Sequence, residues 1–402
     1  MKKIFYVLFA GFLIGSLTFT SAQENKKMTE LLDKVKQQFA PDKRTAIFNV
    51  HTVEENGAVT LKGETNLPHA KDKLLAELKK NNIKVKDEIS MLPSKDLEGK
   101  TFGVVDLSVA NLRTNHEHSA EMATQGLLGT PVKVLKKDHG WYLIQTPDEY
   151  IAWVDGDGVE TMTRSDYDNW NNASKVIYTA FYGFTLSEPD LNAAHVSDIV
   201  KGNILKYMGE EKGFVKVEYP DQRIAFIPKD ECTDFNGWLE SRDPSAENLI
   251  KTGKSLMGLP YLWGGTSVKG ADCSGFTKTV YYLNGVILPR DASQQVYSGD
   301  PVDTKDSFDN LKPGDLLFFG NKATATTKEK ATHVAMYIGN GEYIHSSGRV
   351  RINSLDMSKK DFNSHRFDTF LRARRILTSL DKNGISLIKS NNLKLKVENE
   401  TK

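Results

Sequence analysis

The sequence has few cysteines and almost no net charge. Only Cys232 and Cys273 occur among 402 residues, and 53 basic residues are balanced by 52 acidic ones. A broad electrostatic surface for nucleic acid or anionic lipid is therefore not expected. Exported domains often pair their cysteines in a disulfide. Here the surroundings of Cys273 favour a reactive thiol instead, and Cys232 is expected to be a partly buried, unreactive thiol.

A second absence is that of long apolar runs after the first twenty residues. At the start of the chain, Lys2 and Lys3 precede an apolar run over residues 4–17, and small residues follow at positions 20–22. This pattern predicts a secretory signal peptide over residues 1–22. The alternative, a membrane anchor, needs roughly 20 apolar residues. We therefore expect an exported protein without stable membrane insertion, and a monomer.

The length predicts several domains, because roughly 100–200 residues make one domain. Residues 23–100 follow the order helix, strand, strand, helix, strand, which predicts a small α/β domain. With the segment Val-Thr-Leu-Lys-Gly-Glu-Thr at 59–65 before its second helix, this order resembles the BON domain of bacterial envelope proteins. An unrelated α/β spacer is the alternative.

Residues 101–160 change to short strands separated by turns, which predicts a small β-barrel. The phrases Val-Ala-Asn-Leu-Arg at 109–113 and Tyr-Ile-Ala-Trp-Val at 150–154 resemble bacterial SH3-type domains. Residues 161–242 are expected to form a second, more diverged copy of this barrel.

The stretch Tyr-Leu-Trp-Gly-Gly at 261–265, followed by Asp-Cys-Ser-Gly-Phe at 272–276, has the pattern expected of a nucleophile. Apolar residues at i, i+4 and i+7 from Phe276 predict a helix that starts near Cys273. Unpaired amides and the dipole at a helix N-terminus favour the thiolate, which is the nucleophilic form. The alternative is that Cys273 is an inert core residue.

A cysteine nucleophile needs a base, and that base needs a group to orient it. His333 and His345 lie on either side of the turn residues 339–341, in a predicted β-hairpin. The two histidines share a face if the loop has an odd number of residues, as a three-residue loop would, whereas a two-residue Asn-Gly turn requires a bulge. We predict that the imidazoles share a face. A zinc site is the alternative, but no close spacing joins Cys273 to the histidines, so no metal or cofactor is expected.

These motifs resemble the NlpC-type family of bacterial cell-wall peptidases, which have a papain-like α/β fold. The resemblance covers about residues 245–375 and includes Leu-Pro-Arg-Asp at 288–291 and Tyr-Ile-His at 343–345. It implies an α+β protein with a papain-like catalytic domain over residues 243–377. Two SH3-type β-barrels and the N-terminal α/β (BON-like) domain precede it, and a polar, solvated tail over residues 378–402 follows.

The resemblance also implies the chemistry. In that family a cysteine attacks an amide carbonyl, a histidine is the base and a second polar residue orients it; here these are Cys273, His333 and His345. The backbone amide of Cys273 is expected to help bind the oxyanion. Tyr261 would add a phenolic donor, or else be a core aromatic beside Trp263.

The reaction implied is hydrolysis of the γ-D-glutamyl-diamino acid bond in peptidoglycan stem peptides. The motifs are most similar to SH3-bearing members of the dipeptidyl-peptidase VI type, which release L-Ala-γ-D-Glu from stems with a free N-terminal L-Ala. Asp272 is then expected to bind the ammonium. Glu121 and Tyr150 of the first barrel would complete the pocket, the alternatives being a solvated glutamate and a barrel tyrosine.

Further substrate contacts are assigned to Ser274, Trp263 and Asp291. Related enzymes have Arg-Asp-Ser where this chain has Arg290-Asp291-Ala292, so one hydroxyl contact to the substrate is absent. The polar stretch 321–331 lacks apolar periodicity and is predicted to be an irregular loop, with a lid as one hypothesis.

Two other functions remain open at this point. One is a peptidoglycan-binding envelope protein, and the other is an amidase or acyltransferase on the same fold. The BON-like domain favours a periplasmic location over full secretion.

Overall fold

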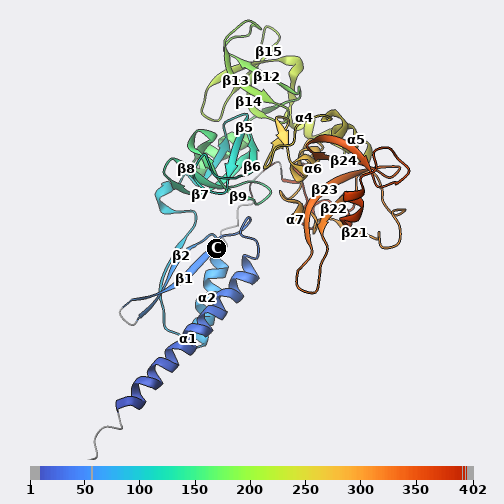
Figure 1. Cartoon of the computed structure of the whole chain (residues 1–402). Coiled ribbons are helices and arrows are strands. Elements are labelled where there is room, and N and C mark those ends of the chain that lie inside the picture. The colour runs from blue at the N-terminus through green and yellow to red at the C-terminus, as the bar shows by residue number, and fades with distance from the viewer. Residues whose placement is uncertain (1–9, 56–57, 392, 394, 396–402) are drawn as a thin grey trace, which may run out of the picture. The chain divides into compact units, whose positions relative to one another are not determined.

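The computed structural model describes residues 10–55, 58–391, 393 and 395 (Figure 1). The chain divides into two compact units, Met1–Asp96 and Leu97–Lys402, which are described separately. Residues 1–9 of the predicted signal peptide lie outside the described residues. Among the helices of the described part, none is long and apolar enough to cross a membrane.

The first unit has the element order predicted from the sequence. Its elements are α1 Ala10–Phe39, β1 Phe48–Glu55, β2 Ala58–Thr65, α2 Pro68–Lys80 and β3 Lys86–Met91. The sheet order is β1-β2-β3, with β2 and β3 parallel. Val35, Leu61 and Leu74 are buried in one core. The first helix begins at Ala10, before residue 23, where the predicted α/β domain starts.

The first barrel occupies the start of the second unit. Its elements are η1 Lys95–Leu97, β4 Phe102–Val105, β5 Val109–Arg113, β6 Met122–Leu127, β7 Pro131–Asp138, β8 Trp141–Gln145, β9 Ile151–Asp155, η2 Gly156–Gly158 and β10 Val159–Met162. The sheet order β10-β4-β7-β8-β9-β5-β6 encloses a core that includes Leu112, Val134 and Ile144. Residues 114–121, between β5 and β6, include Glu121.

A second sheet of seven strands follows helix α3 Arg164–Asn172. Its elements are β11 Lys175–Tyr178, β12 Tyr182–Leu186, β13 His195–Val200, β14 Ile204–Glu211, β15 Phe214–Glu218, β16 Ile224–Pro228, η3 Lys229–Glu231 and β17 Cys232–Asp234. The order is β13-β12-β16-β15-β14-β11-β17. Cys232 is a buried free thiol whose pKa burial raises to about 11, which fits the expected unreactive role.

The C-terminal domain packs helices on a mixed-length antiparallel sheet. Its elements are α4 Phe235–Glu240, α5 Ala246–Ser255, β18 Thr266–Ser267, β19 Gly270–Ala271, α6 Cys273–Tyr282, β20 Val286–Ile287, α7 Ala292–Gln295, β21 Asp300–Val302, β22 Leu316–Asn321, β23 Lys330–Gly339, β24 Glu342–Ser347, β25 Arg349–Ser354, α8 Ser364–Asp368 and β26 Phe370–Arg375. The main sheet has the order β21-β26-β22-β23-β24-β25. Phe276 and Val280 of α6 are fully buried against it, as the predicted helical stripe required.

The segment after residue 377 is not a solvated tail, so that prediction was wrong. β27 Ser386–Leu387 pairs with β20, and α9 Ile388–Asn391 follows. Ile388 is fully buried, and Leu395 packs with Tyr167 and Trp170 beside the first barrel. Scattered apolar residues without a clear period gave no signal in the sequence, because their partners come from distant elements.

The predicted irregular loop 321–331 was wrong at both ends. Asn321 and Lys330 are paired residues of the antiparallel hairpin β22–β23, so only residues 322–329 form the connection. Figure 1 shows this hairpin extending away from the body of its domain. Glu329 at its base accepts a 2.5 Å bond from Arg372 of β26.

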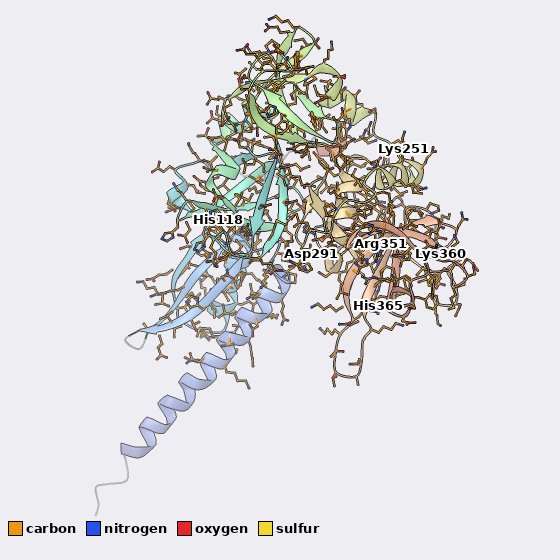
Figure 2. The ribbon with its side chains drawn as sticks, turned by 45° about the horizontal axis from the view of Figure 1, so that its top comes forward. His118, Lys251, Asp291, Arg351, Lys360 and His365 are labelled. Atoms are coloured by element: carbon orange, nitrogen blue, oxygen red, sulfur yellow. The ribbon has the colours of Figure 1, made fainter. Side chains whose placement is uncertain are left out.

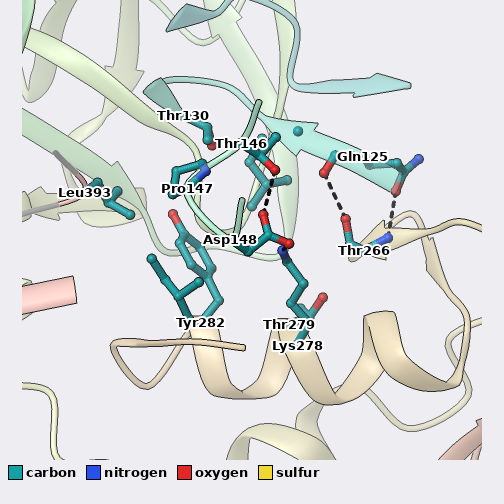
Figure 3. A pocket seen from close by; sticks show the side chains of 13 residues that line it. Gln125, Thr130, Thr146, Pro147, Asp148, Thr266, Lys278, Thr279, Tyr282 and Leu393 are labelled. Carbon is teal, nitrogen blue, oxygen red and sulfur yellow. Dashed lines mark hydrogen bonds and ion pairs between the residues drawn. The ribbon is translucent and has the colours of Figure 1, made fainter. Parts of the chain in front are cut away.

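The first barrel packs directly on helix α6 (Figure 3). The Gln125 side chain accepts a hydrogen bond from the Thr266 amide at 3.0 Å, and Lys278 of α6 makes an ion pair with Asp148. A small cavity of about 70 Å³ lies between them, beside Tyr282. These contacts fix the barrel against the helix that starts at Cys273.

Candidate active site

Cys273 is the first residue of α6, and Asp272 is the N-cap, whose Oδ1 accepts the Gly275 amide at 2.7 Å. Burial raises the pKa of the Cys273 thiol to about 11, and the Asp272 charge adds to the rise. Bonds from the Val334 and Ser274 amides act in the opposite direction. Desolvation therefore outweighs the helix terminus, and the expected thiolate is a neutral thiol in the absence of substrate.

The Trp-Gly-Gly motif brings the barrel close to this helix. Gly264 has φ +78°, and a Cβ there would lie 2.3 Å from the Met122 carbonyl oxygen of the barrel. Trp263 is 62% exposed, and its Nε1 donates to Glu121 Oε1 at 2.7 Å. Glu121, predicted to be a pocket residue of the first barrel, is therefore brought to the catalytic domain by Trp263.

The two histidines share a face, as predicted, but not through a three-residue loop. His333 Nε2 and His345 Nδ1 are 2.7 Å apart. Asn340 and Gly341 form a two-residue turn with φ of 53° and 74°, and the strand register shifts at a bulge between residues 337 and 339. With a two-residue turn alone, His333 and His345 would lie on opposite faces of the sheet. The bulge shifts the alternation by one residue, so the two side chains lie on the same face.

Asn353 of β25 is a member of the site that the sequence did not reveal. Its side-chain amide nitrogen donates to the Asp361 carbonyl at 3.0 Å, so Oδ1 faces His345 Nε2, also at 3.0 Å. An amide oxygen only accepts, so His345 Nε2 is protonated and its Nδ1 accepts from His333 Nε2. The contacts thus leave His333 Nδ1 as the free, basic nitrogen of a neutral imidazole.

Burial also keeps both imidazoles neutral. It lowers the pKa of His333 well below its usual value, and the positive charge of Arg366 contributes. Burial likewise lowers the pKa of His345 to about 4, against the opposing bond to Asn353. A neutral thiol is therefore combined with a neutral base at neutral pH. The Val334 amide, next to His333, donates to the thiol sulfur.

Arg290 forms an ion pair with Asp272, the residue that the sequence suggested would contact the substrate. Its guanidinium is fully buried and donates to both Asp272 oxygens, at 2.6 and 3.2 Å. It also donates to Ser274 Oγ at 3.0 Å. The Gly264 amide and Ser274 Oγ are further donors to the same carboxylate.

Asp272 therefore accepts from five donors and is 6% exposed. This gives Asp272 a positioning contact at the helix N-terminus, and its contact with the substrate ammonium stays a prediction. The Ser274 hydroxyl is used in the same network, which disfavours a direct contact with substrate. The sequence did not indicate that Asp272 and Ser274 bond to Arg290, because Arg290 is separated from Asp272 by the whole of α6.

The other predicted pocket residues are found around this network. Asp291 caps the short helix α7, and its side chain remains about a quarter exposed. Ala292, where related enzymes have serine, is buried. Tyr150 is buried in the barrel core near Arg290. Burial raises the pKa of Tyr261 to about 12, and the charge of a Cys273 thiolate is the next cause.

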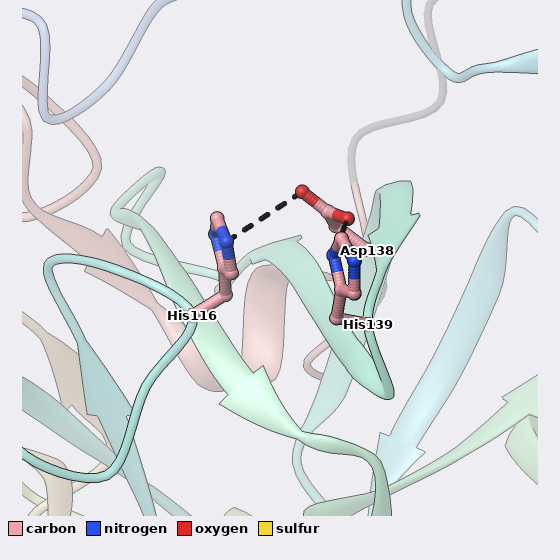
Figure 4. A group of neighbouring side chains, drawn as sticks. All are labelled: His116, Asp138 and His139. Atoms are coloured by element: carbon pink, nitrogen blue, oxygen red, sulfur yellow. Dashed lines mark hydrogen bonds and ion pairs between the residues drawn. The ribbon is translucent and has the colours of Figure 1, made fainter.

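One group of three potential metal ligands is found among the described residues, and it does not include Cys273. It consists of His116, Asp138 and His139, which lie on the first barrel (Figure 4). His139 is in the turn after β7, and its ring nitrogen lies 2.5 Å from Asp138 Oδ1. The cysteine site therefore has no metal-ligand geometry in the described part of the chain.

Two family profiles match the chain. That of the NlpC/P60 family matches residues 258–369, and that of the bacterial dipeptidyl-peptidase Sh3 domain matches residues 112–159. A gamma-D-glutamyl-L-lysine dipeptidyl-peptidase from Bacillus cereus is 33% identical over 235 residues, which cover 56% of this chain and 67% of that relative. The chain belongs to the NlpC/P60 family.

Other members of the NlpC/P60 family are similar over most of their length. The dipeptidyl-peptidase 6 of Lysinibacillus sphaericus is 27% identical over 272 residues, 63% of this chain and 91% of that protein. The crystal structure of an NlpC/P60 family protein from Bacillus cereus matches with a TM-score of 0.57 at 27% identity. The match covers 69% of this chain and 99% of that one. Family and relatives support a cell-wall peptidase.

Proposed function

We propose that this NlpC/P60 protein is a cysteine peptidase that hydrolyses the γ-D-glutamyl-diamino acid bond of muropeptides with a free N-terminal L-Ala. It would release L-Ala-γ-D-Glu in cell-wall turnover or recycling. The observation that carries this proposal is the hydrogen-bonded series His333–His345–Asn353, together with Val334, the neighbour of His333, whose amide bonds to the Cys273 thiol. A wall-binding protein without activity would have no use for a tautomer fixed in this way.

The contacts support the following steps. His333 Nδ1 takes the thiol proton as Cys273 Sγ attacks the γ-carbonyl carbon of D-Glu, and the amide at the start of α6 stabilises the oxyanion. His333 then donates that proton to the leaving amine, which leaves a thioester on Cys273. Water, deprotonated by His333, hydrolyses the thioester and regenerates the thiol. Tyr261 is the proposed second donor to the oxyanion, because its phenol is within electrostatic range of Cys273.

For the substrate ammonium we propose Glu121 and Asp291 instead of Asp272. Asp272 already has five donors, whereas Asp291 is partly exposed and Glu121 lies against the exposed Trp263. Tyr150 is the proposed neighbour of this acidic pair, by its position near Arg290. A short substrate whose ammonium must reach residues of the barrel fits an enzyme that removes a dipeptide. The diamino acid itself is addressed below.

Location and the remaining domains belong to the same proposal. We propose export through the segment 1–22, a periplasmic site of action and a BON-like role for residues 23–100. The order helix, strand, strand, helix, strand in that unit supports the last point. Fractionation of cells that express the full chain, with cytoplasmic and periplasmic markers, tests the location.

The activity is tested by incubating the protein with L-Ala-γ-D-Glu-diamino acid peptides whose L-Ala amine is free or acetylated. We expect release of L-Ala-γ-D-Glu from the free peptide only, and a loss of at least about a thousandfold in Cys273→Ala. A wild-type protein that cleaves neither peptide would rule out the proposed activity. Equal cleavage of free and acetylated peptides would instead rule out the recognition of the ammonium.

A further inference from the structure

Two partly buried arginines of the catalytic domain have neither an ion pair nor a side-chain hydrogen bond within the described residues. Arg290, Arg372 and Arg375 each donate to a carboxylate at 2.5–2.8 Å. In contrast, Arg351 and Arg366 make no ion pair and no side-chain hydrogen bond with any residue that the structure describes. Both side chains are only partly exposed, so solvent does not fully replace the missing partner.

Both arginines lie beside the histidine pair. Arg351 of β25 is paired directly with His345 of β24, so the two side chains leave the sheet on the same face. Arg366, from α8, lies over the ring of Phe319 at 5.8 Å, and that ring is 5.9 Å from the ring of His333. Figure 2 marks Arg351 and His365, the residue before Arg366.

Leaving these charges unpaired is costly. Arg351 Nε is buried without an acceptor, and the nearby charge of Arg351 adds to the burial that lowers the pKa of Arg366. A buried donor without a partner loses the hydrogen bonds that it made to water, which destabilises the folded chain. Asp361 adjoins this region through its backbone, but its carboxylate makes no ion pair with either arginine. A carboxylate or another anion that binds here would satisfy these donors.

We infer that Arg351 and Arg366 form a subsite for a carboxylate of the peptide substrate, next to the bond that is cleaved. A guanidinium presents paired N–H donors that match the two oxygens of a carboxylate. A neutral or cationic group at the same place would leave both donors unpaired. This subsite rests on the proposed function and adds to it a requirement for an acidic substrate.

Two carboxylates of a stem peptide lie near the scissile amide. One is the α-carboxylate of D-Glu, and the other is the side-chain carboxylate of meso-diaminopimelate, which lysine lacks. Three tripeptides with an amidated C-terminus, which removes the terminal carboxylate, separate them: L-Ala-γ-D-Glu-meso-diaminopimelate, the same peptide with lysine in third position, and the same peptide with D-isoglutamine in second position. The peptide that loses the target carboxylate should be the poor substrate.

The experiment measures kcat and KM for the three tripeptides with wild type, Arg366→Gln, Arg366→Lys and Arg351→Gln. Lys360→Gln is the matched control, because Lys360 is exposed and loses the same charge. In wild type we expect about a tenfold to a hundredfold preference in kcat/KM for peptides with the target carboxylate. In Arg366→Gln that preference should disappear, mostly through a higher KM for the peptides with the target carboxylate. Arg366→Lys should recover part of it.

An equal loss for all three peptides in Arg366→Gln, or no loss, would overturn the inference. Binding of the same peptides to Cys273→Ala by calorimetry keeps it separate from the proposed activity. If wild type cleaves nothing, but Cys273→Ala binds carboxylate peptides and Cys273→Ala/Arg366→Gln does not, the subsite stands and the activity fails. If wild type cleaves and selectivity is unchanged by either arginine, the activity stands and the subsite fails.

Discussion

Arg290 and the pair Arg351 and Arg366 are cations on two sides of one catalytic cluster, and their surroundings differ. Arg290 is fully buried and its donors are used by Asp272, Ser274 and, through Nε at 3.0 Å, Thr124 Oγ1 of the first barrel. Arg351 and Arg366 have no acidic partner among the described residues. A charge whose donors are satisfied within the chain supports the fold, whereas a charge left unpaired beside reactive groups is available to a ligand.

The largest effect on stability is expected at Arg290, whose donors are satisfied within the chain. Arg290→Gln leaves the Asp272 carboxylate buried without its cation, so we expect the free energy of unfolding to fall by about 3–5 kcal/mol. Urea denaturation measures this. Arg366→Gln is the comparison and should change stability by less than about 1 kcal/mol. If the two variants are destabilised equally, the distinction between a structural and a ligand-binding arginine is wrong.

A smaller effect is expected between the two regions, at Asn353. Asn353→Ala removes the acceptor that fixes the His345 tautomer, so His333 Nε2 loses its defined partner. We expect kcat/KM to fall about tenfold to a hundredfold, with kcat more affected than KM. Asn353→Asp keeps an acceptor oxygen and should retain more activity than the alanine variant. Full activity in Asn353→Ala would show that Asn353 does not orient the histidines.

The smallest effect is a change in pH dependence. Burial first, and then the Arg366 charge, lower the pKa of His333, so the free base persists at mildly acidic pH and the acid limb of kcat/KM should lie below 6.5. Removing a nearby cation makes protonation easier. In Arg366→Gln the limb should therefore move to higher pH, by about a few tenths of a unit. Lys360→Gln should leave it in place, and a shift there would indicate a non-specific charge effect.

Local patterns allowed much of the site to be predicted. The helix at Cys273 follows from apolar spacing, and the shared face of His333 and His345 follows from strand parity. The prediction of a three-residue loop was wrong, because a two-residue turn combined with a bulge also places the two histidines on the same face. The solvated tail failed because Ile388 and Leu395 are buried by partners far away in the chain. No local pattern contains that information.

The sequence alone predicted Cys273 as the nucleophile and His333 as its base, and it gave the class of catalytic fold and the resemblance to cell-wall peptidases, because these depend on residue type and short-range spacing. Tertiary structure decided which charges are satisfied. It joined Asp272 to Arg290, brought Asn353 to His345 and left Arg351 and Arg366 without an acidic partner among the described residues. The physical reason is that pairing of buried charges depends on side chains brought together by packing, and spacing along the chain does not record it.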